Sequence, residues 1–381
     1  MIDHPFWGRG FRPFFFLGAL LAAMAMPLWV FLQQGAVPNV THPAFWHAHE
    51  MVFGFTVAII SGFLLTAVAN WTGGAPARHY HLAVLSGLWF LGRLAMLSSE
   101  LSPILLYIAE LSYLPALILS LAVPLWRSRH VKNYLFIGLL SALWVCDLMS
   151  IIGQSLHAIH VAILWVMVII SVIGGRVIPS FTVAALRRTG VDAVQYSQPG
   201  ADMAAIALGF LTVFAFIFFG DESLITGICA LLVSLVNLLR LYRFKFFQSY
   251  FDPMVWILHI GFLWMILGFF FLFLSSLNFV SFSVALHALT AGGIGTLCIG
   301  MMCRVALGHT GRAIKADFMT VMAFFLMQVS ALIRVFGVLI WPEHHAGWVT
   351  VSGLLWALVF GIYAVFYART LFTPRPDGAA V

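Results

Sequence analysis

Long apolar stretches separated by short polar segments run along the whole chain. A window of about 19 residues resolves them into roughly twelve stretches, each long enough to cross a bilayer as a helix. They lie at about 14–32, 47–69, 81–98, 103–123, 133–152, 156–176, 202–219, 222–240, 254–274, 281–303, 318–340 and 347–367. None has the ten-residue alternation of a barrel strand, and helices satisfy their own backbone hydrogen bonds in lipid. The pattern predicts an all-α polytopic membrane protein with about twelve transmembrane helices.

Basic residues follow every second apolar stretch, and this asymmetry predicts the topology. Apart from Arg93 and Arg334, which lie inside apolar stretches, every lysine and arginine lies before the first stretch, at the end of an even-numbered one or beyond it. Positive charge is retained on the cytoplasmic side of a membrane protein. We therefore expect both termini in the cytoplasm and the odd-numbered loops on the outer side.

The composition supports one integral membrane domain that comprises residues 1–381. The chain is 62% apolar and 8% charged, whereas soluble proteins contain about 25% charged residues. The longest polar gap, about 176–202, divides it into two six-helix halves at about 1–176 and 202–381. We assign the net charge of +6 to cytoplasmic loops that attract anionic membrane lipid, and we expect no nucleic-acid partner.

Ionisable residues inside the apolar stretches gather at one depth. Counted at 1.5 Å per residue, they lie within roughly 10 Å of the outer hydrocarbon boundary. These residues are His47, His49, Glu50, Arg93, Glu110, Asp147, His157, His160, His287 and Arg334. A charge at a helix centre costs roughly 2.5–3.5 kcal/mol, so such residues usually face the bundle interior and mark function. Because histidine is the commonest metal and haem ligand, five histidines in this layer indicate a metal or haem site.

Two histidines precede rows of small residues at helical spacing. His47 is followed on its own face by Met51, Gly54, Ala58 and Ser61, and His287 is followed by Ala291 and Gly295. Such a groove suits a flat macrocycle, but small residues are also how membrane helices pack closely. We expect His47 and His287 to be ligands, with His49 and His160 next. The metal candidates are His47, His49 and His287.

Three acids in the same layer are candidate proton carriers: Glu50, Glu110 and Asp147. Glu50 is expected on the face of His47, and its alternative role is to stabilise the helix dipole in the first turn. Arg93 and Arg334 suit either of two roles. They pair with Glu110 and Asp147, or they hold haem propionates through bidentate hydrogen bonds.

A second group lies on the expected cytoplasmic side and comprises His259, His309, Arg176 and Arg312. His259 lies about one turn inside the ninth stretch, and His309 follows the tenth. These residues either hold a second redox group and receive electrons, or they are hydrogen-bonded residues of the membrane interface.

Several sequence blocks resemble the NnrS family of bacterial membrane proteins. The blocks are HPFWGRGFRPFF, FWHAHEMVFGF with GFLLTAVANWTG, GGRVIPSFT, and HALTAGGIGTLCIGMMCRVALGHTGR. The resemblance implies a twelve-helix protein of the bacterial inner (cytoplasmic) membrane with copper and one or two haem b groups. It also implies a link to denitrification and to protection against nitric oxide. The matching motif residues are His47, His49, Glu50, Arg176, His287, Arg304, His309 and Arg312.

Three functions are compatible with these features. The first is a haem enzyme that reduces nitric oxide near the outer face and takes electrons from quinol or another donor. The second is a non-catalytic haem or copper protein that binds nitric oxide or handles metal. The third is a secondary transporter with six plus six helices, but transporter sites are expected near the bilayer midplane and these charges lie in an outer layer.

Overall fold

The computed structural model describes residues 2–33, 42–98 and 100–378, and within these ranges it is helical, without strands. Twelve helices of the described residues are long and apolar enough to cross a membrane. They are Phe11–Gln33, Pro43–Thr72, Tyr80–Leu97, Pro103–Arg127, Val131–Gly153, Leu156–Arg188, Pro199–Phe219, Leu224–Gln248, Pro253–Ser276, Phe282–His309, Phe318–Ile340 and Pro342–Phe366. The all-α multi-pass prediction is confirmed, while the side on which the termini lie stays a prediction.

The chain groups into two compact units. Unit 1 consists of Met1–Ala162, Met302–Ile314 and Trp356–Val381. Unit 2 consists of Ile163–Met301 and Lys315–Leu355. The organisation into two sequential six-helix halves stays a prediction.

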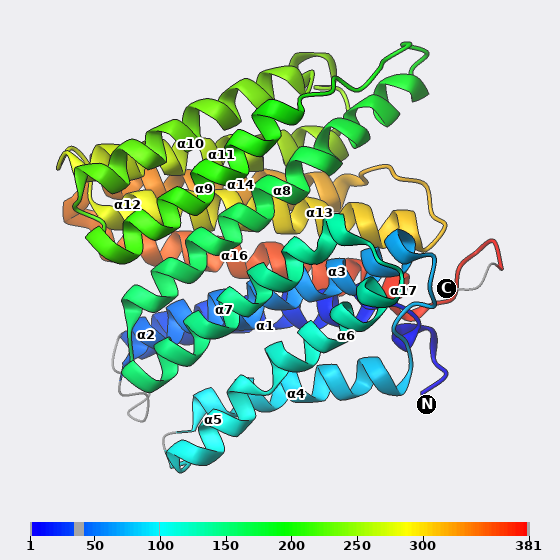
Figure 1. Ribbon diagram of the computed structural model, residues 1–381, viewed down its shortest axis with the longest axis horizontal. Helices are drawn as coiled ribbons and strands as arrows, with labels where there is room; N and C mark the ends of the chain where they lie inside the picture. Colours follow the sequence, from blue (N-terminus) through cyan, green and yellow to red (C-terminus); the bar gives the residue numbers. More distant parts are fainter. Residues whose placement is uncertain (1, 34–41, 99, 379–381) are drawn as a thin grey trace. The chain divides into compact units, whose positions relative to one another are not determined.

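Unit 1 contains the helices of the first third of the chain (Figure 1). Its elements are η1 (Pro5–Trp7), α1 (Phe11–Gln33), α2 (Pro43–His49), η2 (Glu50–Thr56), α3 (Val57–Thr72), α4 (Tyr80–Leu97), α5 (Pro103–Leu111), α6 (Tyr113–Arg127), η3 (Val131–Asn133), α7 (Tyr134–Gly153) and α17 (Ala368–Phe372). Phe6 stacks on Phe372 with ring centroids 4.4 Å apart, and Arg12 donates to the carbonyl of Leu371 at 2.6 Å. These contacts hold the two ends of the described chain together.

Unit 2 contains the helices that follow the central loop (Figure 1). Its elements are α9 (Pro199–Phe219), α10 (Leu224–Arg243), η4 (Phe246–Gln248), α11 (Pro253–Ser276), α12 (Phe282–His287), η5 (Ala288–Ile294), α14 (Phe318–Leu332), η6 (Ile333–Gly337), α15 (Val338–Ile340) and η7 (Pro342–His344). Three helices contribute to both units: α8 (Leu156–Arg188), α13 (Gly295–His309) and α16 (His345–Phe366). Helix α10 packs against α9 and α11, and α11 packs against η5.

Three segments are π-helices: η2, η5 and η6. A π-helix bonds each N–H to the carbonyl five residues earlier, so it shifts the direction of the side chains that follow. In η2 the hydroxyl of Thr56 also donates to the carbonyl of Met51, five residues back, at 2.7 Å. One π-helix follows His49, one follows His287 and one contains Arg334. Because π-helical turns are frequent at functional sites, these three positions are candidates for functional residues.

The segments around the first two π-helices are an internal repeat. Residues 238 positions apart match in sequence: His49 with His287, Gly54 with Gly292, Gly62 with Gly300, Thr72 with Thr310 and Gly73 with Gly311. The same spacing relates the bounds of η2 and η5, and Gly73 and Gly311 share a left-handed backbone with φ of 66° and 69°. Helices α4 and α14 also begin 238 residues apart. The histidine, the π-helix and the left-handed helix end therefore occur twice in the chain, in the same order and at the same spacing.

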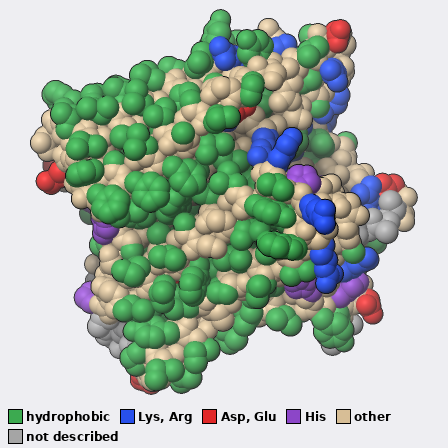
Figure 2. Space-filling model, viewed as in Figure 1, with side chains coloured by type: hydrophobic (Ala, Val, Ile, Leu, Met, Phe, Trp, Pro, Cys, Tyr) green, Lys and Arg blue, Asp and Glu red, His purple; other side chains and the backbone are tan. Residues whose placement is uncertain are grey.

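The surface agrees with a membrane location. Apolar side chains cover most of the face in Figure 2, whereas lysines and arginines gather near its right-hand edge. On α9, for example, Met203, Phe214, Phe218 and Phe219 are exposed. Exposed phenylalanine on a helix suits contact with lipid.

Candidate functional site

Five ionisable side chains meet inside unit 1, and we call them the acidic cluster: His49, Glu50, Arg93, Glu110 and Asp147. They come from α2, η2, α4, α5 and α7, and each is buried. These five residues, which the sequence analysis placed at one depth, therefore also contact one another.

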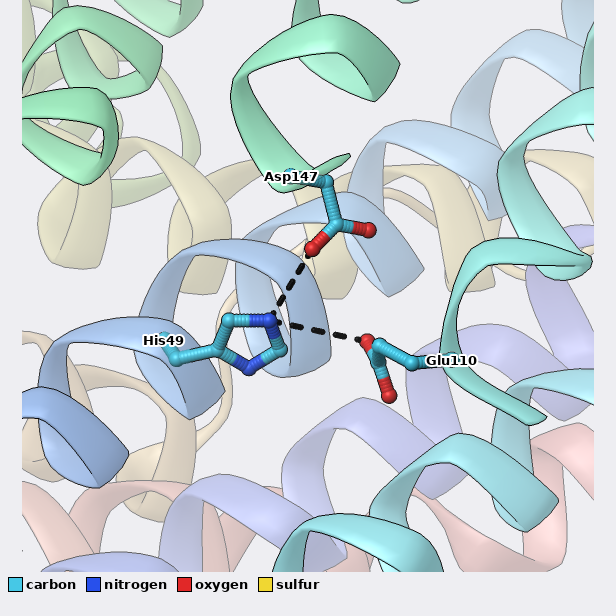
Figure 3. A group of neighbouring side chains, drawn as sticks. All are labelled: His49, Glu110 and Asp147. Atoms are coloured by element: carbon cyan, nitrogen blue, oxygen red, sulfur yellow. Dashed lines mark hydrogen bonds and ion pairs between the residues drawn. The ribbon is translucent and has the colours of Figure 1, made fainter. Parts of the chain in front are cut away.

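His49 lies between the carboxylates of the acidic cluster. Its Nε2 is 3.0 Å from an oxygen of Asp147 and 3.8 Å from an oxygen of Glu110. Its Nδ1 is 3.4 Å from an oxygen of Glu50. Figure 3 shows the imidazole edge directed at the carboxylates of Asp147 and Glu110. Both ring nitrogens therefore face acids.

Arg93 joins two of these acids. It donates to Glu50 at 2.7 Å and, through its other terminal nitrogen, to Oε1 of Glu110. Oε2 of Glu110 is buried and has no hydrogen-bond partner among the described residues. A Cβ atom at Gly92 would lie 2.4 Å from Oε2, so a larger residue there would displace the carboxylate of Glu110. The carboxylate of Glu110 thus keeps one oxygen for a proton or a ligand.

The donor set suits a metal ion as well as protons. One nitrogen of His49 and one oxygen each of Glu110 and Asp147 lie within 4.8 Å of one another. Ligands at 2.0–2.2 Å from a tetrahedral metal ion lie roughly 3–4 Å apart, so small movements would close the site. With a neutral imidazole, three carboxylates face a single guanidinium, and this excess of negative charge favours a divalent cation.

Glu50 contacts two other members of the acidic cluster. Its carboxylate lies 3.4 Å from His49 and 2.7 Å from Arg93, while its expected place on the face of His47 stays a prediction. His47 has a different environment: its ring is half-buried and stacks on Trp29 with centroids 4.1 Å apart.

The small residues near the two histidines serve helix packing. A Cβ atom at Gly54 would lie 2.7 Å from a methyl group of Leu21 and 2.8 Å from Arg93. One at Gly292 would lie 2.5 Å from the ring of Trp264. The space beside both glycines is filled by protein, so the packing alternative applies at these two positions.

In unit 2, His287 contacts Arg334, and we call these two residues the basic pair. Nδ1 of His287 donates to the carbonyl of Ser283 at 2.7 Å, which makes Nε2 the acceptor of a neutral imidazole. Arg334 donates to that Nε2 through Nη2 at 2.9 Å. No carboxylate lies within 4 Å of Arg334 among the described residues, and its buried Nη1 has no partner there. Pairing with acids was one of the two roles expected for these arginines. Arg93 has this role, whereas Arg334 has no acidic partner among the described residues.

The remaining expected site residues lie outside these two groups. His160 is half-buried near the start of α8, and Arg176 lies further along the same helix. His259 is fully buried in unit 2. Its Nδ1 is 3.0 Å from the carbonyl of Val255, and its Nε2 is 3.4 Å from oxygens of Thr182 and Phe244. Both nitrogens of His259 are thus directed at oxygens of the protein.

His309 belongs to unit 1 and lies among arginines. Its Nδ1 is 3.5 Å from Arg9, and its carbonyl accepts from Arg375 at 3.3 Å. Burial and the charges of Arg375 and Arg78 lower the pKa of Arg9. Positive charge is therefore concentrated around His309.

Arg312, three residues after His309, donates to the hydroxyl of Thr373 at 2.8 Å. Burial and, to a smaller extent, the charge of Arg369 lower the pKa of Arg312. His309 and Arg312 belong to unit 1, whereas His259 and Arg176 belong to unit 2.

One buried polar network was missed in the sequence. Arg240 was expected in a loop beyond the eighth stretch, but α10 continues to Arg243 and Arg240 is buried. Its guanidinium donates to Asp202 at 2.9 Å, to Asn237 at 2.6 Å and to Ser171 at 2.7 Å. The spacing of Asn237 and Arg240, one helical turn apart, was a signal in the sequence that the helix continues.

Comparison with known proteins gives one family. A family model described as NnrS protein matches residues 5–375, which is nearly the whole chain. No match is found among curated proteins.

Proposed function

The chain belongs to the NnrS protein family, and from this membership we propose that it is a haem- and copper-containing membrane protein that reduces nitric oxide. The acidic cluster is the observation that carries the proposal, because it combines metal-ligand atoms and proton-carrying groups inside an apolar bundle. Nitric oxide is small, neutral and soluble in lipid. It therefore reaches a buried site between apolar side chains without a polar channel.

Copper fits the donor set of the acidic cluster. Copper(II) binds nitrogen and oxygen donors more tightly than the other divalent first-row metals do. His49, Glu110 and Asp147 would hold the ion, and Glu50 would orient His49 through Nδ1. Bound copper would supply a one-electron redox centre and a Lewis acid there.

Haem coordination needs an imidazole nitrogen that carries a lone pair. In His287 the Nδ1–H is held by the carbonyl of Ser283, so Nε2 carries the lone pair. Metal-bound histidines usually show this arrangement. We propose His287 as a haem ligand within unit 2 and, separately, His47 as a ligand within unit 1. His160, His259 and His309 stay further candidates.

The acidic cluster supplies protons in this proposal. Reduction of two nitric oxide molecules to nitrous oxide and water consumes two electrons and two protons. Glu110 takes a proton on Oε2, the oxygen that has no partner among the described residues, while Oε1 stays bonded to Arg93. Asp147 and Glu50, whose carboxylates lie beside opposite nitrogens of the His49 ring, are the proposed carriers of the second proton.

Electrons come from quinol in the bilayer or from another donor. His309 with Arg312, and His259 with Arg176, are the proposed places where a second redox group receives them. The proposed location is the cytoplasmic membrane of a bacterium, where quinol and membrane lipid both surround the protein.

The test is nitric oxide consumption by the purified protein with a reductant. Asp147→Asn should slow consumption and nitrous oxide formation by about 10²-fold, because it removes a proton carrier and a metal ligand. Glu222→Gln is the matched control, since Glu222 is an exposed acid between α9 and α10. The haem absorption spectrum is recorded for each variant to establish that the protein is intact.

Two results would overturn the proposal. One is equal turnover in the wild type, Asp147→Asn and Glu222→Gln. The other is a haem spectrum that shifts with nitric oxide while no nitrous oxide forms, which would favour the non-catalytic haem or copper protein.

A further inference from the structure

Arg334 carries a buried charge with no acidic partner among the described residues. It is 8% exposed on π-helix η6. Val335, the next residue, is fully buried, and α12, which packs against η6, contributes the buried Val284 and Ala285. A charge removed from water without a counter-ion is strongly unfavourable, so a buried arginine normally has an acid beside it.

Among the residues that the structure describes, the hydrogen-bond partner of this guanidinium is His287, and its imidazole is neutral. His287 must donate its Nδ1–H to the carbonyl of Ser283, since a carbonyl only accepts. Its Nε2 therefore accepts from Nη2 of Arg334 and leaves the positive charge in place. Nη1 is buried and has no hydrogen-bond partner among the described residues. The guanidinium is thus oriented by one contact and retains a donor.

We propose that Arg334, oriented by His287, binds a planar oxyanion of the carboxylate class. A guanidinium presents parallel N–H donors that match the two oxygens of a carboxylate, and this match is stronger than that with a spherical anion. The ligand supplies the missing negative charge. This site is separate from the copper site proposed at the acidic cluster and does not depend on it.

The internal repeat supports this reading independently. His49 and His287 occupy equivalent positions, and each is followed by a π-helix and contacted by groups from neighbouring helices. Around His49 these groups include the carboxylates of Glu50 and Glu110, which neutralise Arg93. The position equivalent to Glu50 is Ala288, so the second copy lacks the acid that follows the histidine in the first copy.

The carboxylate has two sources, a free small oxyanion or a propionate of a bound haem. Coordination of haem by Nε2 of His287 would release Nη2 of Arg334, so that both terminal nitrogens would become available. The experiment is therefore designed to distinguish the two sources. It uses the full-length purified protein, with its haem content measured, and formate as the probe.

The thermal unfolding midpoint is measured against formate concentration, with chloride as the spherical comparison. The variants are Arg334→Gln, Arg334→Lys and the control Arg127→Gln, which removes an exposed arginine. For a free oxyanion we expect saturable stabilisation by formate, at least tenfold tighter than by chloride. Arg334→Gln should weaken formate binding at least tenfold, with Arg334→Lys between the two and Arg127→Gln unchanged.

For a haem propionate we expect no response to formate, and haem per chain that falls at least fivefold in Arg334→Gln but not in Arg127→Gln. Arg334→Lys keeps the positive charge but lacks the two parallel N–H donors of the guanidinium. A partial loss of haem in this variant would therefore show that these donors contribute to haem binding in addition to the charge. The proposal is overturned if neither formate binding nor haem content changes in Arg334→Gln and Arg334→Lys. It is also overturned if formate and chloride act equally in all variants.

Discussion

The acidic cluster of unit 1 and the basic pair of unit 2 share a scaffold and differ in charge. In each, a histidine ends a short α-helix, a π-helix begins at the next residue, and an arginine lies close by. In unit 1 three carboxylates surround the histidine and the arginine. In unit 2 the arginine faces a neutral imidazole alone among the described residues. The comparison teaches that the backbone places the histidine, while the acids decide whether the site favours a cation or an anion.

The largest expected effect comes from the same substitution made in both regions. Arg93→Met leaves the carboxylates of Glu50 and Glu110 buried without their cation, and should lower the free energy of unfolding by about 3–5 kcal/mol. Arg334→Met removes a buried charge that has no counter-ion among the described residues, so the free energy of unfolding should stay unchanged or rise. Chemical unfolding in mixed detergent micelles, without added oxyanion, measures both values. Equal losses in the two variants would break the comparison.

A smaller effect is expected when the close-packed glycines are enlarged. Gly54→Ala and Gly292→Ala should each lower the free energy of unfolding by about 1–3 kcal/mol, because a methyl group would overlap Leu21 in one case and Trp264 in the other. Only Gly54→Ala should also weaken copper binding, since its methyl group meets Arg93 and Glu50. Copper titration of both variants checks this difference. A loss of copper in Gly292→Ala alone would reverse the assignment of the metal to unit 1.

The smallest expected effect concerns the hydroxyl groups of the two π-helices. Thr56→Val removes a bond to the carbonyl of Met51, and Thr290→Val removes one to the carbonyl of Leu286. Each should cost about 1 kcal/mol in the free energy of unfolding. The two variants should behave alike, because each loses one hydrogen bond from a threonine hydroxyl to a backbone carbonyl. A cost above about 3 kcal/mol in one variant alone would show that the two π-helices differ in more than the charges around them.

Much of the fold was predictable because membrane spans need length and apolar composition, and the chain has both. The contacts of the acidic cluster were only partly predictable. A common depth brought Arg93, Glu110 and Asp147 together in the prediction, but depth does not specify which side of a helix a residue faces. The contacts of Glu50 with His49 and Arg93 depend on how neighbouring helices pack, and spacing along one helix does not reveal that packing. Arg240 was missed for a different reason: basic residues were assigned to loops, whereas α10 extends past it.

The basic pair shows the same limit. Proximity of His287 and Arg334 follows from their similar depth, yet the absence of an acid near Arg334 among the described residues depends on the packing of α12 and η6. The internal repeat was visible in the sequence as glycines and a histidine at constant spacing. The coinciding π-helices made it recognisable.

The central claim is that copper is held by one imidazole and two carboxylates in the acidic cluster. Electron paramagnetic resonance of the copper(II)-loaded protein tests it most directly, because the signal reports how many nitrogen nuclei couple to the ion. We predict coupling to one imidazole nitrogen, loss of that signal in His49→Ala, and no change in the signal in Arg334→Gln. Coupling to several imidazoles, or an unchanged signal in His49→Ala, would contradict the account.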